Sequence, residues 1–330
     1  MVIAHARDLS SVQIRATVGR ASEHRSDWGS AVAALPDVSS APEPIVSGEP
    51  VEVADGVFVI PDRRVPLVPN VGIVVGDHAA LIIDTGLGPR NGEYVLGQAK
   101  RLANDRRLFL TTTHFHPEHG FGAQAFKGAA TIVYNRAQRD ELHRKGAAYL
   151  AMFSGLSPSY ATQLKDVELT EPDVTYDGPQ AELDLGGRTV TLHNRGPAHT
   201  SSDQTVLVDG RVLFTGDLAE TRMFPIAPYF PPHDTDVDIA GWISVLDDLL
   251  ALNPAIVVPG HGEIADAQLL VEIRDYLTHI RTRALELPAD EAVAAIEQDA
   301  RKRWSTWDNP EWIAFAVHAA YHSTKASDQG

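Results

Sequence analysis

Three histidines and a glutamate lie within six consecutive positions of the sequence THFHPEHG, as His114, His116, Glu118 and His119. Imidazole nitrogen is the commonest protein ligand for zinc, and carboxylate oxygen is another. Pro117 stiffens the turn and helps to aim its neighbours. A single histidine is usually a surface or core residue, but this spacing after an apolar segment favours a metal site.

Three further ligand-type residues follow downstream, each near the end of an apolar stretch that we expect to be a strand. His199 lies before QTVLV, Asp217 follows RVLFTG, and His261 follows AIVVPG. Loops at strand ends on one edge of a sheet can converge on one site. Because the chain has no cysteine, any metal must be held by nitrogen and oxygen ligands.

The motif HFHPEH, followed in order by His199, Asp217 and His261, resembles the metallo-β-lactamase superfamily, whose signature is His-x-His-x-Asp-His and then His, Asp and His. The segment IIDTG at 82–86 also resembles this family's early Asp-containing turn, and the resemblance covers roughly residues 50–265. It implies an α/β fold, an αββα sandwich with a metal site at one edge.

The resemblance also implies a ligand set for two Zn²⁺ ions, with one Zn²⁺ or one Fe²⁺ as alternatives. The first metal would be held by His114, His116 and His199, and the second by Glu118, His119 and His261, with Asp217 bridging both. A metal-bound hydroxide would be the nucleophile. Asp217 and Glu118 are the residues that we expect to take part in catalysis.

Two carboxylates leave alternatives open. Glu118 departs from the family's aspartate by one methylene, so it can bind the second metal with a different reach, hold that metal weakly and carry a proton, or be a swap without consequence. Asp84 is expected to support the metal-site loops through hydrogen bonds rather than to bind metal. Simple turn chemistry in Asp-Thr-Gly is its other interpretation.

The elements that must position these residues alternate between strands and helices, which predicts a layered α/β fold. Gly76, Asp77 and His78 predict a hairpin turn, Pro89 lies near the start of an expected helix, and RLFLTTT is an expected buried strand that leads into the motif. We predict an N-terminal arm and linker over 1–48, with a helix at 6–24, a catalytic domain over 49–266, and a helical extension over 267–330.

Loops at 62–70 and 219–234 are candidates for the walls of a substrate pocket. The second carries Met223, Phe224, Tyr229 and Phe230 beside Asp217, which suits an apolar or aromatic small molecule; packing into the core is the alternative. Four residues in a predicted helical stretch could form a lid, although packing is the commoner fate of such side chains: Tyr149, Met152, Phe153 and Tyr160. We interpret Trp304, Trp307, Trp312 and Phe315 as core or dimer contact.

The charge and the hydropathy of the chain exclude several partners. The formal net charge of −16 predicts no binding to nucleic acid or to anionic membranes, because both would repel the chain. No apolar stretch approaches a signal peptide or a membrane span, so we expect a cytoplasmic protein. The arm or the C-terminal helices are expected to mediate self-association, such as a homodimer.

We therefore predict a metal-dependent hydrolase that cleaves an ester, lactone or amide bond in a small apolar or aromatic molecule. The alternatives are a β-lactamase, an oxidoreductase that resembles the mononuclear-iron sulfur dioxygenases, a hydrolytic dehalogenase of an aromatic compound, and a metal-binding protein without turnover. The number and kind of bound metals would separate several of these.

Overall fold

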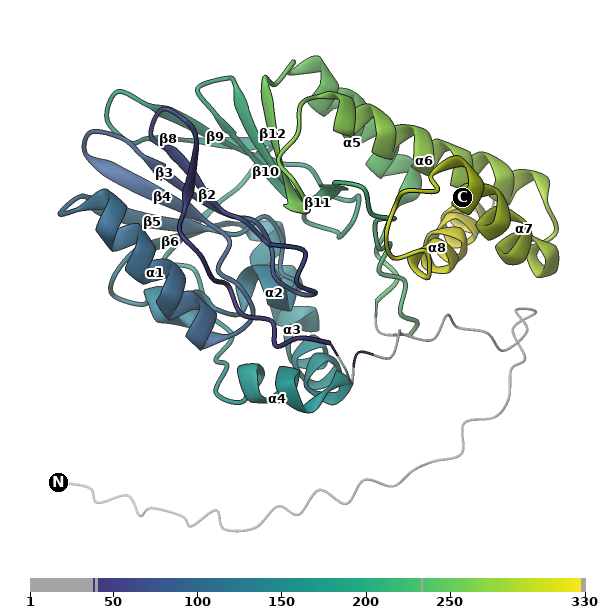
Figure 1. Ribbon diagram of the computed structural model, residues 1–330, viewed down its shortest axis with the longest axis horizontal. Coiled ribbons are helices and arrows are strands. Elements are labelled where there is room, and N and C mark those ends of the chain that lie inside the picture. Colours follow the sequence, from purple (N-terminus) through teal and green to yellow (C-terminus); the bar gives the residue numbers. More distant parts are fainter. Residues whose placement is uncertain (1–37, 39–40, 233, 328–330) are drawn as a thin grey trace, which may run out of the picture. The chain divides into compact units, whose positions relative to one another are not determined.

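The structure is a computed structural model that describes residues 38, 41–232 and 234–327 (Figure 1). Two β-sheets form its centre. The first has the strand order β1-β2-β3-β4-β5-β6-β7, and the second has the order β12-β11-β10-β9-β8. The strands of the first sheet are β1 Val51–Ala54, β2 Val57–Ile60, β3 Val71–Val75, β4 Ala79–Ile83, β5 Arg107–Thr111, β6 Thr131–Asn135 and β7 Val174–Tyr176. Those of the second are β8 Gln180–Asp184, β9 Thr189–Asn194, β10 Gln204–Val208, β11 Val212–Glu220 and β12 Ile256–His261.

Both sheets combine antiparallel and parallel pairs. The predicted hairpin is confirmed, since β3 and β4 pair antiparallel with Ile73 opposite Ile82. The strands that lead to the candidate site run parallel to a neighbour: β4 pairs with β5, and β11 pairs with β12. Every residue of β4 and of β11 is buried, as expected for central strands covered on both faces.

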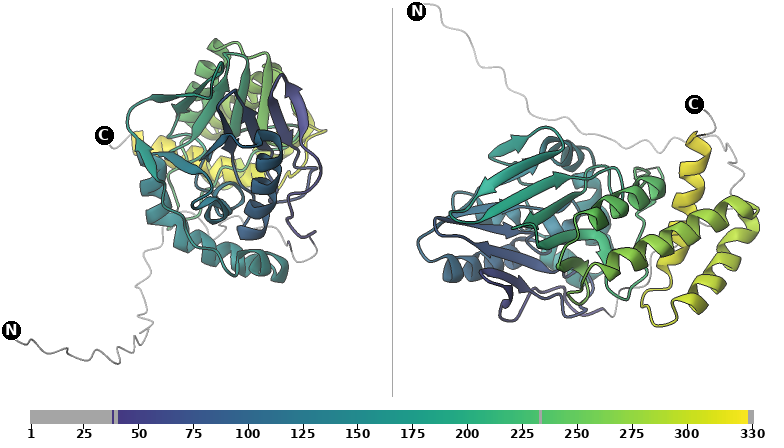
Figure 2. Two further views of the ribbon diagram at one scale, coloured as in Figure 1. Left: turned by 90° about the vertical axis from the view of Figure 1, so that its left-hand side faces the viewer. Right: turned by 90° about the horizontal axis from the view of Figure 1, so that it is seen from above.

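Helices cover the outer faces of the sheets. The helices next to the first sheet are α1 Pro89–Ala103, α2 Pro117–Gly120, the short 3₁₀ helix η1 Ala123–Phe126, α3 Arg136–Leu156 and α4 Pro158–Leu164. The others are α5 Ile239–Ala251, α6 Gln268–Glu286, α7 Ala289–Arg303 and α8 Trp312–Ser327, and Figure 2 shows α5 and α6 along the second sheet. The indole of Trp242 in α5 donates a hydrogen bond to the carbonyl of Leu218 in β11, 3.0 Å away. These layers confirm the predicted αββα sandwich and its helical C-terminal extension.

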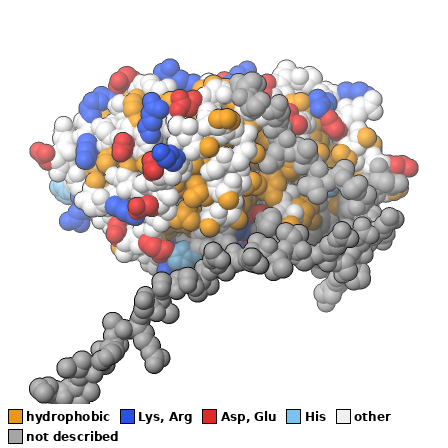
Figure 3. Space-filling view, turned by 90° about the horizontal axis from the view of Figure 1, so that it is seen from below, with side chains coloured by type: hydrophobic (Ala, Val, Ile, Leu, Met, Phe, Trp, Pro, Cys, Tyr) orange, Lys and Arg blue, Asp and Glu red, His pale blue; other side chains and the backbone are white. Residues whose placement is uncertain are grey.

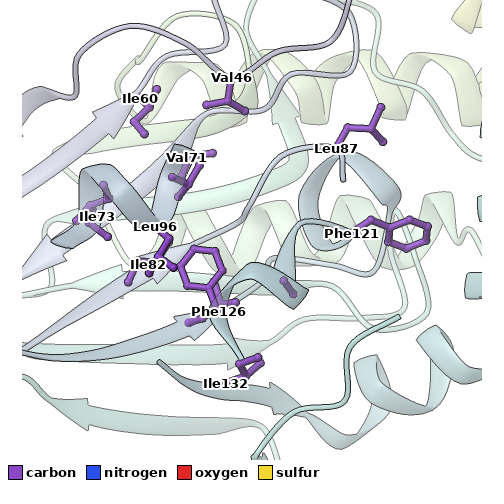
Figure 4. Close-up of a cluster of buried hydrophobic side chains, with 14 of the residues drawn as sticks. Val46, Ile60, Val71, Ile73, Ile82, Leu87, Leu96, Phe121, Phe126 and Ile132 are labelled. Atoms are coloured by element: carbon purple, nitrogen blue, oxygen red, sulfur yellow. The ribbon is translucent and has the colours of Figure 1, made fainter. Parts of the chain in front are cut away.

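Two hydrophobic clusters hold the layers together. Between the sheets, Leu81 and Ile83 of the first sheet pack with Val206 and Phe214 of the second. On the outer face of the first sheet, alternate residues of the same strands, such as Ile82, pack against α1 and η1 (Figure 4). The sheet therefore buries apolar side chains on both faces, which accounts for its nearly continuous apolar strands. Each fully buried side chain of this size contributes about 1.5–3 kcal/mol.

The segment before β1 is fastened to α1. The side chain of Asn91 accepts a hydrogen bond from the backbone of Val46 at 2.9 Å and donates one to the carbonyl of Pro44 at 2.8 Å. Val46 itself is a member of the outer cluster. Residues 1–37, with the helix predicted at 6–24, lie outside the described residues. Self-association through the arm or the C-terminal helices stays a prediction.

The surface and the helices add two observations. Figure 3 shows one face of the protein, on which hydrophobic side chains gather in the middle and charged side chains lie mostly toward the edges. Among the described residues, no helix is both long enough and apolar enough to cross a membrane.

Candidate metal centre and substrate cavity

The ends of several strands deliver the predicted ligands to one place. Residues 112–120 follow β5 and contain α2, while Asp217 lies within β11 and His261 ends β12. His199 lies on the connection between β9 and β10. Two groups of side chains form there, each able to place its ligand atoms within 4.8 Å of one another: His114, His116, His199 and Asp217, and Glu118, His119, Asp217 and His261.

The first group has the spacing of a metal site. Nδ1 of His116 lies 3.0 Å from Nε2 of His114 and 3.2 Å from Nε2 of His199. Oδ2 of Asp217 lies 3.7 Å and 3.8 Å from these two Nε2 atoms. Metal–ligand bonds of about 2.0–2.1 Å in a tetrahedron separate the ligand atoms by about 3.3–3.4 Å. The observed distances scatter around that value.

The second group is built on the other oxygen of Asp217. Oδ1 of Asp217 lies 3.2 Å from Nε2 of His119 and 3.7 Å from Nε2 of His261. Oδ1 of Asp217, Nε2 of His119 and Oε2 of Glu118 are buried and have no hydrogen-bond partner among the described residues. Buried polar atoms without partners are costly, and a cation between them would satisfy all three.

Hydrogen bonds fix which nitrogen of His199 and of His261 faces the other ligand atoms. Nδ1 of His199 lies 3.1 Å from the carbonyl of Ile226, and Nδ1 of His261 lies 3.0 Å from the carbonyl of Val68. A carbonyl only accepts, so each Nδ1 donates its hydrogen to it, and Nε2 is the nitrogen that each ring can offer to a metal. Such outer partners orient the histidines of metal sites in this way.

Asp84 fixes the orientation of two further imidazole rings, those of His119 and His114. Its Oδ2 accepts from Nδ1 of His119 at 2.9 Å. It also accepts from the hydroxyl of Thr113 at 2.9 Å. The hydroxyl oxygen of Thr113 in turn lies 3.1 Å from Nδ1 of His114. Each of these two rings can therefore offer the lone pair of Nε2 to a metal beside the carboxylate of Asp217. Lone pairs that face a carboxylate fit a cation, so the donor set suits a bound metal.

The electrostatics agree with a site built for positive charge. Burial lowers the pKa of His114 and His116 well below its usual range and that of His199 to about 4, so these rings stay neutral and able to bind metal. Burial also acts on His119, but Asp217 and Asp84 outweigh it and raise its pKa. Although burial opposes it, the surrounding histidines lower the pKa of Asp217 well below its usual range.

One glycine is required by this arrangement. A β-carbon at Gly260, in β12, would lie 1.8 Å from Oδ1 of Asp217 and 2.6 Å from the backbone of Gly216. Any side chain there would displace the carboxylate that both groups share. The first glycine of VVPGHG is therefore part of the site, although it supplies no ligand.

The two groups open into a cavity of about 570 Å³. His116, Glu118, Asp217 and His261, which belong to the two groups, line part of it. Apolar side chains make up most of the rest: Val38, Val65, Pro66, Leu67, Tyr149, Met152, Phe153, Leu156, Tyr160, Met223, Ile226, Pro228, Phe230 and Trp312. This size and lining are typical of small-molecule sites.

Two of the four predicted pocket residues line this cavity, Met223 and Phe230. Phe224 points instead into the helical layer, where its ring lies 5.5 Å from that of Tyr276 and 5.4 Å from that of Trp307. Tyr229 lies outside the lining that the described residues form. Consecutive residues of an irregular loop face different directions, so the loop was identifiable from the sequence but the inward side chains were not.

Other lining residues differ from the preferred interpretation of the sequence. Tyr149, Met152, Phe153 and Tyr160 all line the cavity, for which packing alone was the commoner expectation. Trp312, interpreted as core or dimer contact, also lines it, whereas Phe315 is buried as expected. Arg64 and Glu220 lie within the predicted wall loops 62–70 and 219–234, but no motif singles out either side chain.

Comparison with known proteins decides the family. The sequence profile of the metallo-β-lactamase superfamily matches residues 64–261, which is more than half of the chain. The chain belongs to the metallo-β-lactamase superfamily. The matched range ends at His261, the last residue of the second ligand group, so α6, α7 and α8 lie beyond it.

The proteins that this chain resembles carry the names of different activities. The acyl-coenzyme A thioesterase MBLAC2 of Homo sapiens is 25% identical over 246 residues, which cover 67% of this chain and 83% of that protein. Among solved structures, a metallo-β-lactamase from Pontibacter korlensis has a TM-score of 0.54 at 18% identity and covers 70% of this chain and 98% of its own. The inverting sec-alkylsulfatase Pisa1 from a Pseudomonas species has a TM-score of 0.64 at 16% identity and covers 83% of this chain and 50% of its own. The solved structures support the fold alone.

Glu118 occupies the place of the superfamily's aspartate. It lies in the first turn of α2, is buried, and reaches the second ligand group. The longer side chain is therefore compatible with that group. Burial, the largest influence, raises the pKa of Glu118.

Proposed function

We propose that this chain is a metal-dependent hydrolase that cleaves the ester or thioester bond of a small compound with an apolar acyl group. The observation that carries the proposal is that residues of both ligand groups line an apolar cavity. The 25% identity to an acyl-coenzyme A thioesterase supports an acyl-transfer reaction to water.

Two zinc ions are the cofactors that fit the donor set, in the ligand assignment that the sequence suggested. The metals would polarise the carbonyl of the substrate and lower the pKa of a bound water to about 7. A complete second group with four residues favours a paired site over the mononuclear iron of the dioxygenase alternative. The protein's part is to hold ligand atoms in place before the substrate arrives.

The aromatic side chains of the cavity are placed to bind the apolar part of the substrate beside the metal ligands. The ring of Tyr149 stacks on His116 with centroids 5.1 Å apart, and Phe230 lies 6.4 Å from Tyr149. Burying an acyl chain of several methylenes against them is favourable by about 0.8 kcal/mol for each methylene. The same contacts would exclude water that does not take part in the reaction.

A buried ion cluster connects this aromatic wall to a loop that carries a predicted metal ligand. Nζ of Lys145 donates to Glu141 at 2.6 Å and to Asp234 at 2.7 Å. Asp234 also accepts from the hydroxyl of Tyr149 at 2.5 Å, and Glu141 accepts from Ser202, in the loop that carries His199. One cluster on α3 therefore fixes both an aromatic wall residue and a ligand loop.

The proposal is tested with thioesters and esters that share one acyl group and differ in chain length. We expect hydrolysis that requires added zinc and increases from acetyl to medium-length acyl chains, because each added methylene buries more apolar surface. The matched variants are His116→Ala, which removes a ligand, and His193→Ala, which removes a histidine of β9 outside both groups. Equal activity in the two variants would refute the assignment.

A further inference from the structure

The rim of the cavity is acidic, whereas a phosphorylated substrate requires basic side chains where it binds. Its exposed lining residues include Asp308 and Glu311, on the segment that leads into α8. Among the described residues that line the cavity, Arg64 is the one with a permanently positive side chain. The cation that could meet a phosphate is therefore a single guanidinium.

That guanidinium is already engaged. Nε and Nη2 of Arg64 donate to the two carboxylate oxygens of Glu263 at 2.9 Å and 2.5 Å, and Nη1 donates to Asp308 at 2.9 Å. Nη2 also donates to the carbonyl of Thr221 at 2.9 Å. The hydrogen bond from Arg64 is the main reason that the pKa of Glu263 falls to about 2, so this pair is fully ionised at neutral pH.

The neighbouring cation is paired in the same way. Arg222 donates to Glu263 at 2.9 Å, so three carboxylates, those of Glu263, Asp308 and Glu311, accompany two guanidiniums at this side of the cavity. Tight phosphate binding needs Arg or Lys donors that are free to turn toward the phosphate oxygens. The chain as a whole, at −16, adds long-range repulsion of anions.

A chain of aromatic contacts, partly behind the cavity wall, connects the aromatic lining to this acidic rim. Phe230 lies 5.6 Å from Phe315, and Phe315 lies 5.5 Å from Trp312, which follows Glu311 directly and lines the cavity. Aromatic faces next to carboxylates attract cations and accept neutral groups. The acidic rim and the aromatic wall thus both disfavour negatively charged substrates.

We propose that this enzyme takes its apolar acyl group from an uncharged or positively charged leaving group and discriminates against coenzyme A thioesters. The inference rests on the proposed hydrolase function and specifies its substrate class. The apolar acyl chain would lie along Tyr149, Met152 and Phe153, and the leaving group would reach Asp308 and Glu311. The phosphates of coenzyme A would meet carboxylates there and would find Arg64 already bonded.

Three octanoyl thioesters test this directly: those of thiocholine, which is cationic, of N-acetylcysteamine, which is neutral, and of coenzyme A. All release a thiol that a disulfide reagent detects, and the chain has no cysteine of its own to interfere. We expect kcat/KM to fall in that order, with the coenzyme A thioester about tenfold or more below the neutral one at low salt. The gap should shrink at about 1 M salt, where the Debye length is about 3 Å.

A charge reversal at the rim gives the second arm. Glu311→Lys should raise the ratio of kcat/KM for the coenzyme A thioester to that for the neutral thioester several-fold, while Glu182→Lys, on exposed β8 outside the cavity, should leave the ratio unchanged. A wild-type enzyme that favours the coenzyme A thioester, or a ratio that does not respond to Glu311→Lys, would overturn the inference alone. Absence of turnover with all three thioesters would overturn the proposed function and the inference with it.

Discussion

Asp84 offers the sharpest test of how the protein prepares its metal ligands. The replacement Asp84→Asn keeps the shape of the side chain. It also suits the backbone, because φ of residue 84 is 70°, in the left-handed region that asparagine tolerates better than most residues. The amide oxygen can still accept from the backbone of Thr113, which lies 2.7 Å from Oδ1. The amide NH₂ then takes the place of Oδ2 and faces His119.

The consequence falls on His119. An amide NH₂ group only donates hydrogen bonds. Nδ1 of His119 must therefore become the acceptor, and Nε2 must carry the hydrogen. Nε2 is the atom that faces Asp217 at 3.2 Å and that the second group needs as a lone pair. Loss of such an orienting partner typically weakens metal binding about 10- to 100-fold, or about 1.4–2.8 kcal/mol.

Calorimetric titration of the metal-free protein with zinc measures both sites in one experiment. We expect the class of sites that uses His119 to weaken by this factor in Asp84→Asn. The class that uses His114 should weaken less, because the hydroxyl of Thr113 lies between Asp84 and that ring. Asp173→Asn is the matched control, because Asp173 also accepts from a backbone N–H, that of Ile132 at 2.8 Å, but lies outside both ligand groups. Two sites of unchanged affinity in Asp84→Asn would refute the role of Asp84.

Three further predictions concern the second metal, the cavity wall and pH. Glu118 must fold its longer side chain to reach its metal, so stepwise chelation should remove one metal early, and Glu118→Asp should change that step; equal loss in both proteins would make the substitution inconsequential. Tyr149→Phe removes the hydroxyl that donates a hydrogen bond to Asp234, so it should lower the free energy of unfolding in urea by about 1–3 kcal/mol while the metal content stays unchanged. An unchanged urea midpoint of unfolding would contradict this. Burial lowers the pKa of His199 from 6.5 to about 4, so its contribution to the stability of the metal-free protein is complete above about pH 6.5 and is lost as pH falls toward 4; a stability profile in that range that His199→Gln does not flatten would be inconsistent with this.

The ligand residues and the layered fold could be predicted from the sequence because both are written in local patterns. HFHPEH places four ligand-type side chains within six residues, and the apolar runs before Asp217 and His261 mark buried strands whose ends meet at one edge. The order of the motifs then identified the family, which the match over 64–261 confirms.

The cavity could not be predicted in the same way, because its walls come from elements that are distant in sequence. Trp312 reaches it from α8 with no local signal of that role, and although the loop 62–70 was a predicted wall, nothing in that loop singles out Arg64. Trp312 has the spacing of a core residue, and whether such a ring faces the interior or a cavity depends on how α8 packs against α6 and α7. The tautomers set by Asp84 likewise depend on a contact with His119 that spans 35 residues.

Hydrolysis in this cavity should require a metal held by these two ligand groups. The most direct test measures hydrolysis of the octanoyl thioester of N-acetylcysteamine by the metal-free protein as zinc is added in known equivalents. We expect no hydrolysis without metal, recovery in proportion to the zinc bound, and no recovery in His116→Ala. Hydrolysis at the full rate by protein shown by metal analysis to be free of zinc and other metals, or full recovery in His116→Ala, would contradict it.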